Sequence, residues 1–213
     1  MPRILILGIG NLLWADEGFG VRAVEALNRD YEFPDNVRLM DGGTQGLYLI
    51  EHVMSADILV VFDAVDYGLA PGSLKLVEGD AVPKFLGAKK MSLHQTGFQD
   101  VLATAELLGK APRHLFLIGV QPVELEDYGG SLRAAVKAQI PTAAGHALAY
   151  LSRFGIEAKR RAQPLPEDAT IACERMVMSR YEAERPDEDT ACRAGDARFM
   201  QRLSAQAPKG AAN

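Results

Sequence analysis

The sequence predicts an α/β fold: a three-layer sandwich in which a twisted, mostly parallel sheet of about five strands, one of them antiparallel, lies between helices on both faces. Two observations predict this class. Short apolar runs alternate along the chain with segments whose apolar residues recur at helical spacing. The run Asp57–Val65 is apolar at consecutive positions, as a central parallel strand covered on both faces is. Such strand–helix alternation is typical of an open sheet with right-handed crossovers.

Each element has its own sequence signal. Apolar runs bounded by turn residues predict strands at Ile4–Gly8, Val37–Gly43, Asp57–Val65, Ser73–Gly79 and Arg113–Pro122. The fourth run follows an A-P-G turn after a short link, so it is predicted to be the antiparallel strand. Apolar spacing predicts helices at Gly18–Asp30, Gly46–Met54, about Thr96–Leu108 and about Ser131–Phe154. Pro141 is expected to kink or split the last helix.

The character of the chain changes near residue 156. From there prolines interrupt, acids and bases mix, and the apolar content falls. Residues 1–155 are therefore predicted to form the α/β domain, and residues 156–213 a C-terminal extension that is partly helical or disordered. Within it, Glu167–Arg185 is a weakly amphipathic candidate helix that carries Ile171, Met176 and Tyr181.

Composition excludes several classes of protein. A formal net charge of -5 gives no indication of the basic surface that nucleic-acid binding requires. No stretch approaches the roughly 20 apolar residues that cross a bilayer, and no secretory signal is present, so we expect a cytoplasmic protein without membrane insertion. Cys173 and Cys192 match no zinc or redox spacing, which fits a reducing compartment.

A glycine turn follows the first predicted strand and leads into two adjacent acids. The string Gly8–Leu13, GIGNLL, begins like the dinucleotide fingerprint G-x-G-x-x-G, but Leu13 stands where the third glycine would be. Asp16 and Glu17 would also place negative charge where a pyrophosphate needs helix amides. A nucleotide-binding α/β enzyme is therefore the weaker interpretation, and carboxylates at this place are better explained by a cation.

Two further residues can join these acids around a cation. In an open α/β sheet the working crevice lies beyond the carboxyl ends of the strands, where the strand order reverses. Glu17 follows the first strand, Asp63 ends the third, and His94 precedes a helix. Two carboxylates and one imidazole make a reasonable divalent-metal set. Each residue also has a structural alternative. Glu17 could be an acid in the first turn of a helix, Asp63 could cap a loop, and His94 could be a histidine at a helix start that bonds to the backbone.

Several strings taken together resemble the maturation endopeptidases of nickel–iron hydrogenases. They are GIGNLLWADEGFGVRAVE, DGGTQG, VVFDAVD, SLHQTGFQDVL and LIGVQP, and their order and spacing fit over about residues 3–155. The details WADEGFG and YGGSLRAAV are most similar to members that serve uptake-type hydrogenases. The resemblance implies a twisted, parallel-rich sheet between helices. It also implies one reaction, the removal of a short C-terminal extension from the large-subunit precursor after the nickel–iron centre has been loaded.

The resemblance further implies site residues and partners. The family's metal-contacting positions fall on Glu17, Asp63 and His94, and the acid pair of its first motif falls on Asp16 and Glu17. The DGGTQG loop carries Asp41, a position linked in this family to substrate recognition or cleavage. The implied nickel belongs to the precursor, which is the expected partner. No organic cofactor is expected, and we expect a monomer.

Three mechanisms are open, because the sequence has no G-x-S-x-G, no H-E-x-x-H and no cysteine in the matching region. We favour one in which Glu17, Asp63 and His94 grip the precursor's nickel. The scissile peptide then lies beside a water that Glu17, Asp16 or Asp41 deprotonates. The enzyme could instead bind its own divalent ion, or use an aspartic dyad such as Asp16 with Asp41. A non-catalytic nickel-sensing chaperone would use the same three ligands and leave the precursor uncut.

Overall fold

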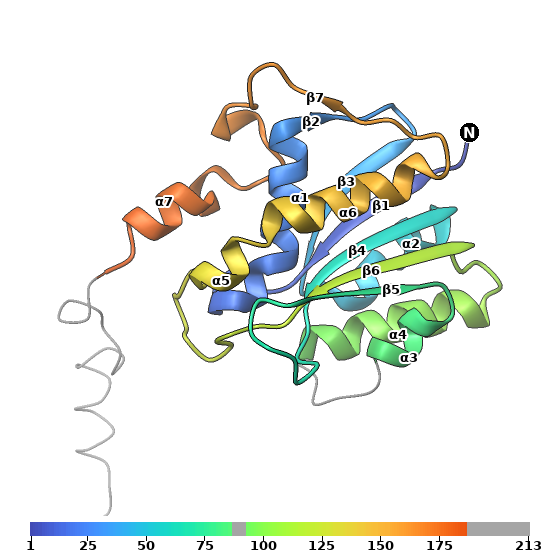
Figure 1. Cartoon of the computed structure of the whole chain (residues 1–213). Coiled ribbons are helices and arrows are strands. Elements are labelled where there is room, and N and C mark those ends of the chain that lie inside the picture. Colours follow the sequence, from blue (N-terminus) through green and yellow to red (C-terminus); the bar gives the residue numbers. More distant parts are fainter. Residues whose placement is uncertain (87–92, 187–213) are drawn as a thin grey trace, which may run out of the picture. The chain divides into compact units, whose positions relative to one another are not determined.

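The computed structural model describes residues 1–86 and 93–186 (Figure 1). Met1–Ala183 form one compact unit, and the second unit, Glu184–Asn213, falls outside the described residues after position 186. None of the helices in the described part of the chain combines the length and apolar character that a bilayer crossing requires.

A five-stranded sheet forms the centre of the compact unit, in the order β3-β1-β4-β6-β5. The strands are β1 (Ile4–Ile9), β3 (Val37–Gly43), β4 (Ile58–Ala64), β5 (Leu74–Glu78) and β6 (His114–Val120). The first strand pairs in parallel with β3 and β4, β4 pairs in parallel with β6, and only β5 runs antiparallel to its neighbour. The predicted sheet, including its antiparallel strand, is confirmed.

Helices cover both faces of this sheet, which confirms the predicted three-layer sandwich (Figure 1). On one face lie α1 (Phe19–Asp30) and α6 (Ile140–Ser152), and on the other α2 (Ile50–Ser55), α3 (Ala81–Leu86) and α4 (Leu93–Leu107). Successive side chains of a strand point to opposite faces, so Ile4 and Ile6 pack under α1 while Leu5 and Leu7 pack in the other core. All seven residues of β4 are buried, as its apolar run predicts.

The last predicted helix is split, as Pro141 indicated. A single turn, α5 (Ala134–Lys137), is followed by α6, and Pro141 stands in the first turn of α6. Proline is tolerated there because the first amides of a helix have no intrahelical acceptor. The proline therefore begins a helix and does not kink one.

The compact unit extends beyond the predicted domain boundary at residue 155. Ile156 is buried, β7 (Lys159–Arg160) pairs with β2 (Tyr31–Glu32), and Val177 is buried as well. The predicted helix over Glu167–Arg185 was wrong as one element: it is two short turns and a short helix, namely η3 (Glu167–Ala169), η4 (Glu174–Met176) and α7 (Met178–Ala183). Residues 156–183 are thus part of the folded unit, because their apolar side chains complete the core under α1.

Candidate active site at the carboxyl edge of the sheet

The glycine turn after β1 allows the acid-bearing segment to fold back onto the strand ends. Gly10 has a φ of +139°, and a side chain there would collide with the backbone carbonyl of Glu17. Gly20 packs against the carbonyl oxygens of Ile9 and Phe62, so α1 starts directly on the ends of β1 and β4. Gly10 is therefore packed against the backbone of Glu17, whereas the second glycine of a dinucleotide-binding turn lets the backbone approach the pyrophosphate, which argues against the dinucleotide interpretation.

Asp16 fastens this turn to the loop that follows β6. It stands in η1 (Ala15–Gly18), and its side chain is fully buried, at 0% exposure. One carboxylate oxygen accepts hydrogen bonds from the amides of Val123 and Glu124, at 2.8 and 2.9 Å, and the other accepts from the amide of Arg133 at 2.7 Å. Both oxygens are therefore committed to backbone amides, and the carboxylate is shielded from solvent.

Glu17 and Asp63 lie on neighbouring elements at this edge. Glu17 is half-buried in η1, which contacts β4. Asp63 is 1% exposed, near the carboxyl end of β4, in register with Gly119 of β6. The ring of Tyr67 occupies the space that a side chain at Gly119 would fill. Burial, and then the negative charge of Asp63, raise the pKa of Tyr67.

The third predicted metal ligand, His94, is the second residue of α4, and its side chain lies outside the described residues. The backbone of this helix start can be located through Gly97, which packs against Gly46 at the end of the DGGTQG loop. The string begins inside β3 and Gly46 follows the end of that strand, so the first turns of α4 lie at the same carboxyl edge as Glu17 and Asp63. Among the described residues no three candidate ligands are grouped closely enough to hold a metal ion; the predicted trio includes His94, whose side chain is not among them, and stays a prediction.

Asp41 ends the regular part of β3 beside the glycine turn. It pairs with Gly8, and the amide of Gly10 donates to the carbonyl of Gly43 at 3.0 Å, which links the two turns. The Asp41 carboxylate is half-buried and accepts a 2.8 Å hydrogen bond from the Gly43 amide. Burial raises the pKa of Asp41, opposed by that hydrogen bond and by the positive charge of Arg22.

Gln121 is a site-supporting residue that the sequence did not single out. Its side chain is buried, and its oxygen accepts hydrogen bonds from the amides of Tyr67 and Leu69, at 2.8 and 3.1 Å. Its amide nitrogen donates to Asp66 at 2.9 Å. Gln121 therefore holds the loop that follows Asp63. The only signal for it was its place directly after an apolar strand, within the LIGVQP string.

Two aromatic residues flank the acids and have different roles. Phe19 is fully buried in the core, whereas Trp14 is half-buried and packs edge-on against Tyr128, with ring centroids 5.3 Å apart. Phe19 is therefore a structural residue of the helix start. The Trp14–Tyr128 pair, in contrast, borders the edge where the turn after β1 meets the loop after β6.

Comparison with known proteins gives consistent matches. The description "Hydrogenase maturation protease" belongs to the family that matches residues 21–150. The chain is 64% identical to the hydrogenase expression/formation protein HupM of Azotobacter chroococcum mcd 1, over 93% of this chain and 94% of that protein. It is 43% identical to the hydrogenase 2 maturation protease of Escherichia coli K12, over 73% and 94% respectively.

A solved structure also has this fold. The hydrogenase maturating endopeptidase HybD from E. coli matches with a TM-score of 0.72 and 40% sequence identity, covering 75% of this chain and 98% of that chain.

Proposed function

The chain belongs to the hydrogenase maturation protease family, and from this premise we propose that it removes a short C-terminal extension from the nickel-loaded precursor of an uptake-type hydrogenase large subunit. Like its relatives, it is a hydrolase of the endopeptidase class. The proposal is supported by the contact of the turn that carries Glu17 with β4, which carries Asp63, and by the packing of Gly97 in α4 against Gly46, which follows β3 at the same edge of the sheet.

Exposed apolar side chains at this edge support a polypeptide substrate. Large exposed side chains follow β1, β3 and β6, the strands around the candidate site; they are Leu13, Leu47, Tyr48, Val123 and Tyr128. A continuous apolar surface is typical of a site that receives another chain, and we propose that these side chains form one along the edge. A substrate segment that crosses this edge would pass both Asp41 and Glu17.

We propose that Glu17, Asp63 and His94 contact the nickel of the precursor, which acts as part of the substrate. Two carboxylates and one imidazole suit a borderline divalent ion. Three protein ligands leave coordination positions that the precursor itself fills, so a loaded precursor is held better than an empty one. Holding the scissile peptide at a fixed place can lower the barrier by several kcal/mol.

In the proposed reaction a water oxygen attacks the scissile carbonyl carbon while a carboxylate accepts the water proton. That proton then passes to the departing amine as the peptide bond breaks. We assign the base to Glu17 or Asp41. Asp16 is the poorest candidate, because its two oxygens accept backbone hydrogen bonds in a buried place. For the same reason we regard an aspartic dyad of Asp16 with Asp41 as the weaker mechanism.

The test is cleavage of purified, nickel-loaded precursor by the variants Glu17→Gln, Asp63→Asn and His94→Gln. Each variant should fold and should process the precursor at least about 100-fold more slowly, because a ligand or base is lost. Unchanged cleavage by all three would reject the metal contact. The cytoplasmic location, the monomeric state and the lack of an organic cofactor stay predictions.

A further inference from the structure

Two aromatic side chains beside the candidate site remain partly exposed. Trp14 is half-buried in the turn after β1, and Tyr128, in the loop after β6, is 66% exposed. Their ring centroids lie 5.3 Å apart in an edge-on contact, and their backbones are paired in an isolated antiparallel β-bridge. The two rings therefore form one surface, which we call the aromatic pair.

Tyr128 stands in a tight turn that is fastened to the turn after β1. The Gly130 amide donates to the Asp127 carbonyl at 3.0 Å, and Gly129, at the third position of this turn, has a φ of +75°. A positive φ at that position is typical of a type II turn. The Gly129 amide also donates to the Leu13 carbonyl at 2.7 Å. Backbone contacts on both sides of Tyr128 thus fix its position.

Arg133 joins this tight turn to the buried acid of the site. Its Nη2 donates to Asp127 Oδ2 at 2.8 Å, while its backbone amide donates to Asp16 Oδ1 at 2.7 Å. The residue that follows Asp127 is Tyr128. One residue therefore ties the loop of the aromatic pair to the segment that carries the acids.

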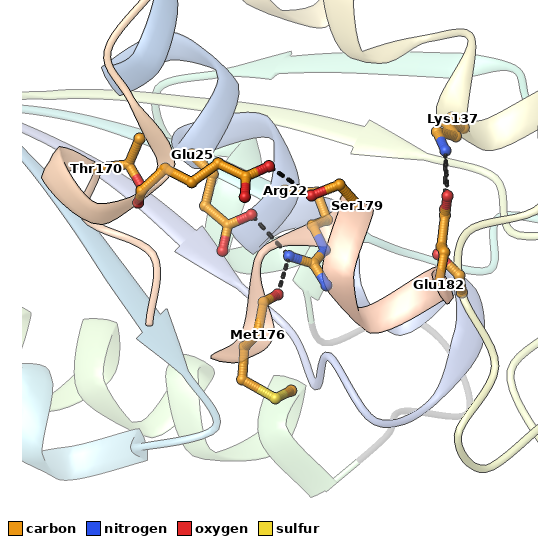
Figure 2. A network of polar contacts seen from close by, with 9 residues as sticks. Arg22, Glu25, Lys137, Thr170, Met176, Ser179 and Glu182 are labelled. Carbon is orange, nitrogen blue, oxygen red and sulfur yellow. Dashed lines mark hydrogen bonds and ion pairs between the residues drawn. The ribbon is translucent and has the colours of Figure 1, made fainter. Parts of the chain in front are cut away.

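The same loop is held again where it leaves the site. Glu182 accepts a hydrogen bond from Ser131 Oγ at 2.7 Å and one from Lys137 Nζ at 2.8 Å, of which Figure 2 shows the second. A loop fixed at several points loses little conformational freedom when it binds another molecule. The ring of Tyr128 is therefore prepared for a contact.

The aromatic pair is continuous with the proposed catalytic edge through the backbone. The carbonyl of Trp14 accepts a 2.9 Å hydrogen bond from the Glu17 amide, so one turn carries both residues. Between them Ala15 is buried and has a φ of +41°, a conformation that persists only where the surroundings fix it. The spacing of Trp14 and Glu17 is therefore fixed by a rigid turn.

We propose that the aromatic pair receives an apolar side chain of the precursor a few residues from the scissile bond, which makes Tyr128 a specificity-determining residue. This inference rests on the proposed function. Whether Glu17 contacts the nickel or accepts the water proton, it lies at the reacting peptide, so the segment next to the cut is the chain that covers the rings. Tyrosine and tryptophan dominate many protein interfaces, because they bury a large area and have few rotamers to lose.

The first test is the KM of Tyr128→Ser for nickel-loaded precursor. The side chain is mostly exposed, so the variant should fold with a melting temperature close to that of the wild type. We expect KM to rise about tenfold and kcat to stay within about twofold, because the ring binds substrate and transition state alike. Tyr128→Phe should restore KM, since the ring makes the contact. An unchanged KM for Tyr128→Ser, or no rescue by phenylalanine, overturns the proposal.

Leu107→Ser is the matched control for the loss of exposed apolar surface. Leu107 is 87% exposed and ends α4, about 20 Å along the helix from the start that lies at the site. This variant should leave KM and kcat unchanged. A rise in KM like that of Tyr128→Ser overturns the proposal, because the effect would then not belong to the aromatic pair.

A double-mutant cycle between the two proteins identifies the side chain that the rings contact. Each apolar or charged residue within about four positions of the mapped cut, roughly 13 Å of extended chain, is changed to alanine in the precursor. One apolar change should raise KM about tenfold with the wild type and less than about twofold with Tyr128→Ser. Coupling to a charged residue, or to none, overturns the proposal. A wild-type chain that leaves the loaded precursor uncut rejects the proposed function, and this inference with it.

Discussion

At the scale of single residues, Asp16 and Glu17 are adjacent but have different surroundings. Asp16 accepts three backbone hydrogen bonds in the interior, and Glu17 lies half-buried at the sheet edge. We expect Asp16→Asn to lower the free energy of unfolding by about 2–3 kcal/mol. An NH₂ group would replace one carboxylate oxygen, and its N–H groups would face backbone N–H groups that are also donors. Glu17→Gln should cost less than about 1 kcal/mol. Urea unfolding of the two variants measures both values, and equal losses would contradict a structural role for Asp16.

A second prediction concerns Asp41 and pH. Burial raises its pKa above the ordinary value of 3.8, so the folded chain holds this proton more tightly than the unfolded chain. The resulting stabilisation is present below the unfolded pKa and is lost as the pH rises through the folded pKa. Asp41→Asn keeps an oxygen for the Gly43 amide but cannot titrate. The stability of the wild type relative to Asp41→Asn should therefore fall as the pH rises above 3.8. Urea unfolding at several pH values tests this, and a constant difference would refute it.

The different roles of the two acids could not be predicted from sequence. Both are short acids at the start of a helix, and the amides that bind Asp16 come from Val123, Glu124 and Arg133, more than a hundred residues away. The position of Asp63 near the end of a buried strand could be predicted, because it closes an apolar run. Gln121 could not, since nothing local distinguishes a polar residue that supports a loop from a surface one.

At the scale of elements, the start of α1 depends on close backbone contact. A side chain at Gly20 would meet the carbonyl oxygens of Ile9 and Phe62, so Gly20→Ala has to push the helix away from β1 and β4. We expect a loss of stability of about 1–3 kcal/mol or more. Precursor processing should also fall, because Glu17 moves with the helix start.

Gly145→Ala is the matched control. It lies within α6, and a side chain there meets no atom within 4 Å. Alanine at this position should raise stability by about 0.5–1 kcal/mol and leave processing unchanged. Thermal unfolding and the cleavage assay separate the two variants. Similar behaviour of both would show that the close packing of α1 on the strand ends is not required.

The main elements were predictable because each carries a local pattern. The apolar run of β4, the antiparallel β5 and the split near Pro141 all follow from residues within the element or its flanking turn. The segment Arg161–Ala183, which packs along α1, was not predictable in the same way. Its contacts with α1 are made largely by backbone amides, at Arg161, Leu165 and Ile171, and backbone groups leave no mark on the sequence.

At the scale of the whole molecule, the strand order brings the site together. The strand order is β3-β1-β4-β6-β5. The chain passes from β1 to β3 on one side of β1, and then from β3 to β4 on the other side. The strand order therefore reverses at the end of β1, where α/β sheets form their ligand crevice. Asp41 and Asp63 lie near the ends of β3 and β4, and Glu17 follows β1, so all three come from adjacent strands. The segment Arg161–Ala183 is held at this end of α1 by the hydrogen bond from Arg22 to Met176 O and by the one from Ser131 to Glu182. The loop after β6 is held by the hydrogen bond from the Arg133 amide to Asp16.

We propose that the C-terminal extension of the precursor is cleaved only when the precursor contains its nickel centre. The most direct measurement is the intact mass of the large-subunit precursor after incubation with the purified chain, once with nickel and once without. We expect the loaded precursor to lose a single C-terminal peptide and the empty precursor to keep its full mass. Equal cleavage of both forms, or an uncut loaded precursor, would contradict the claim.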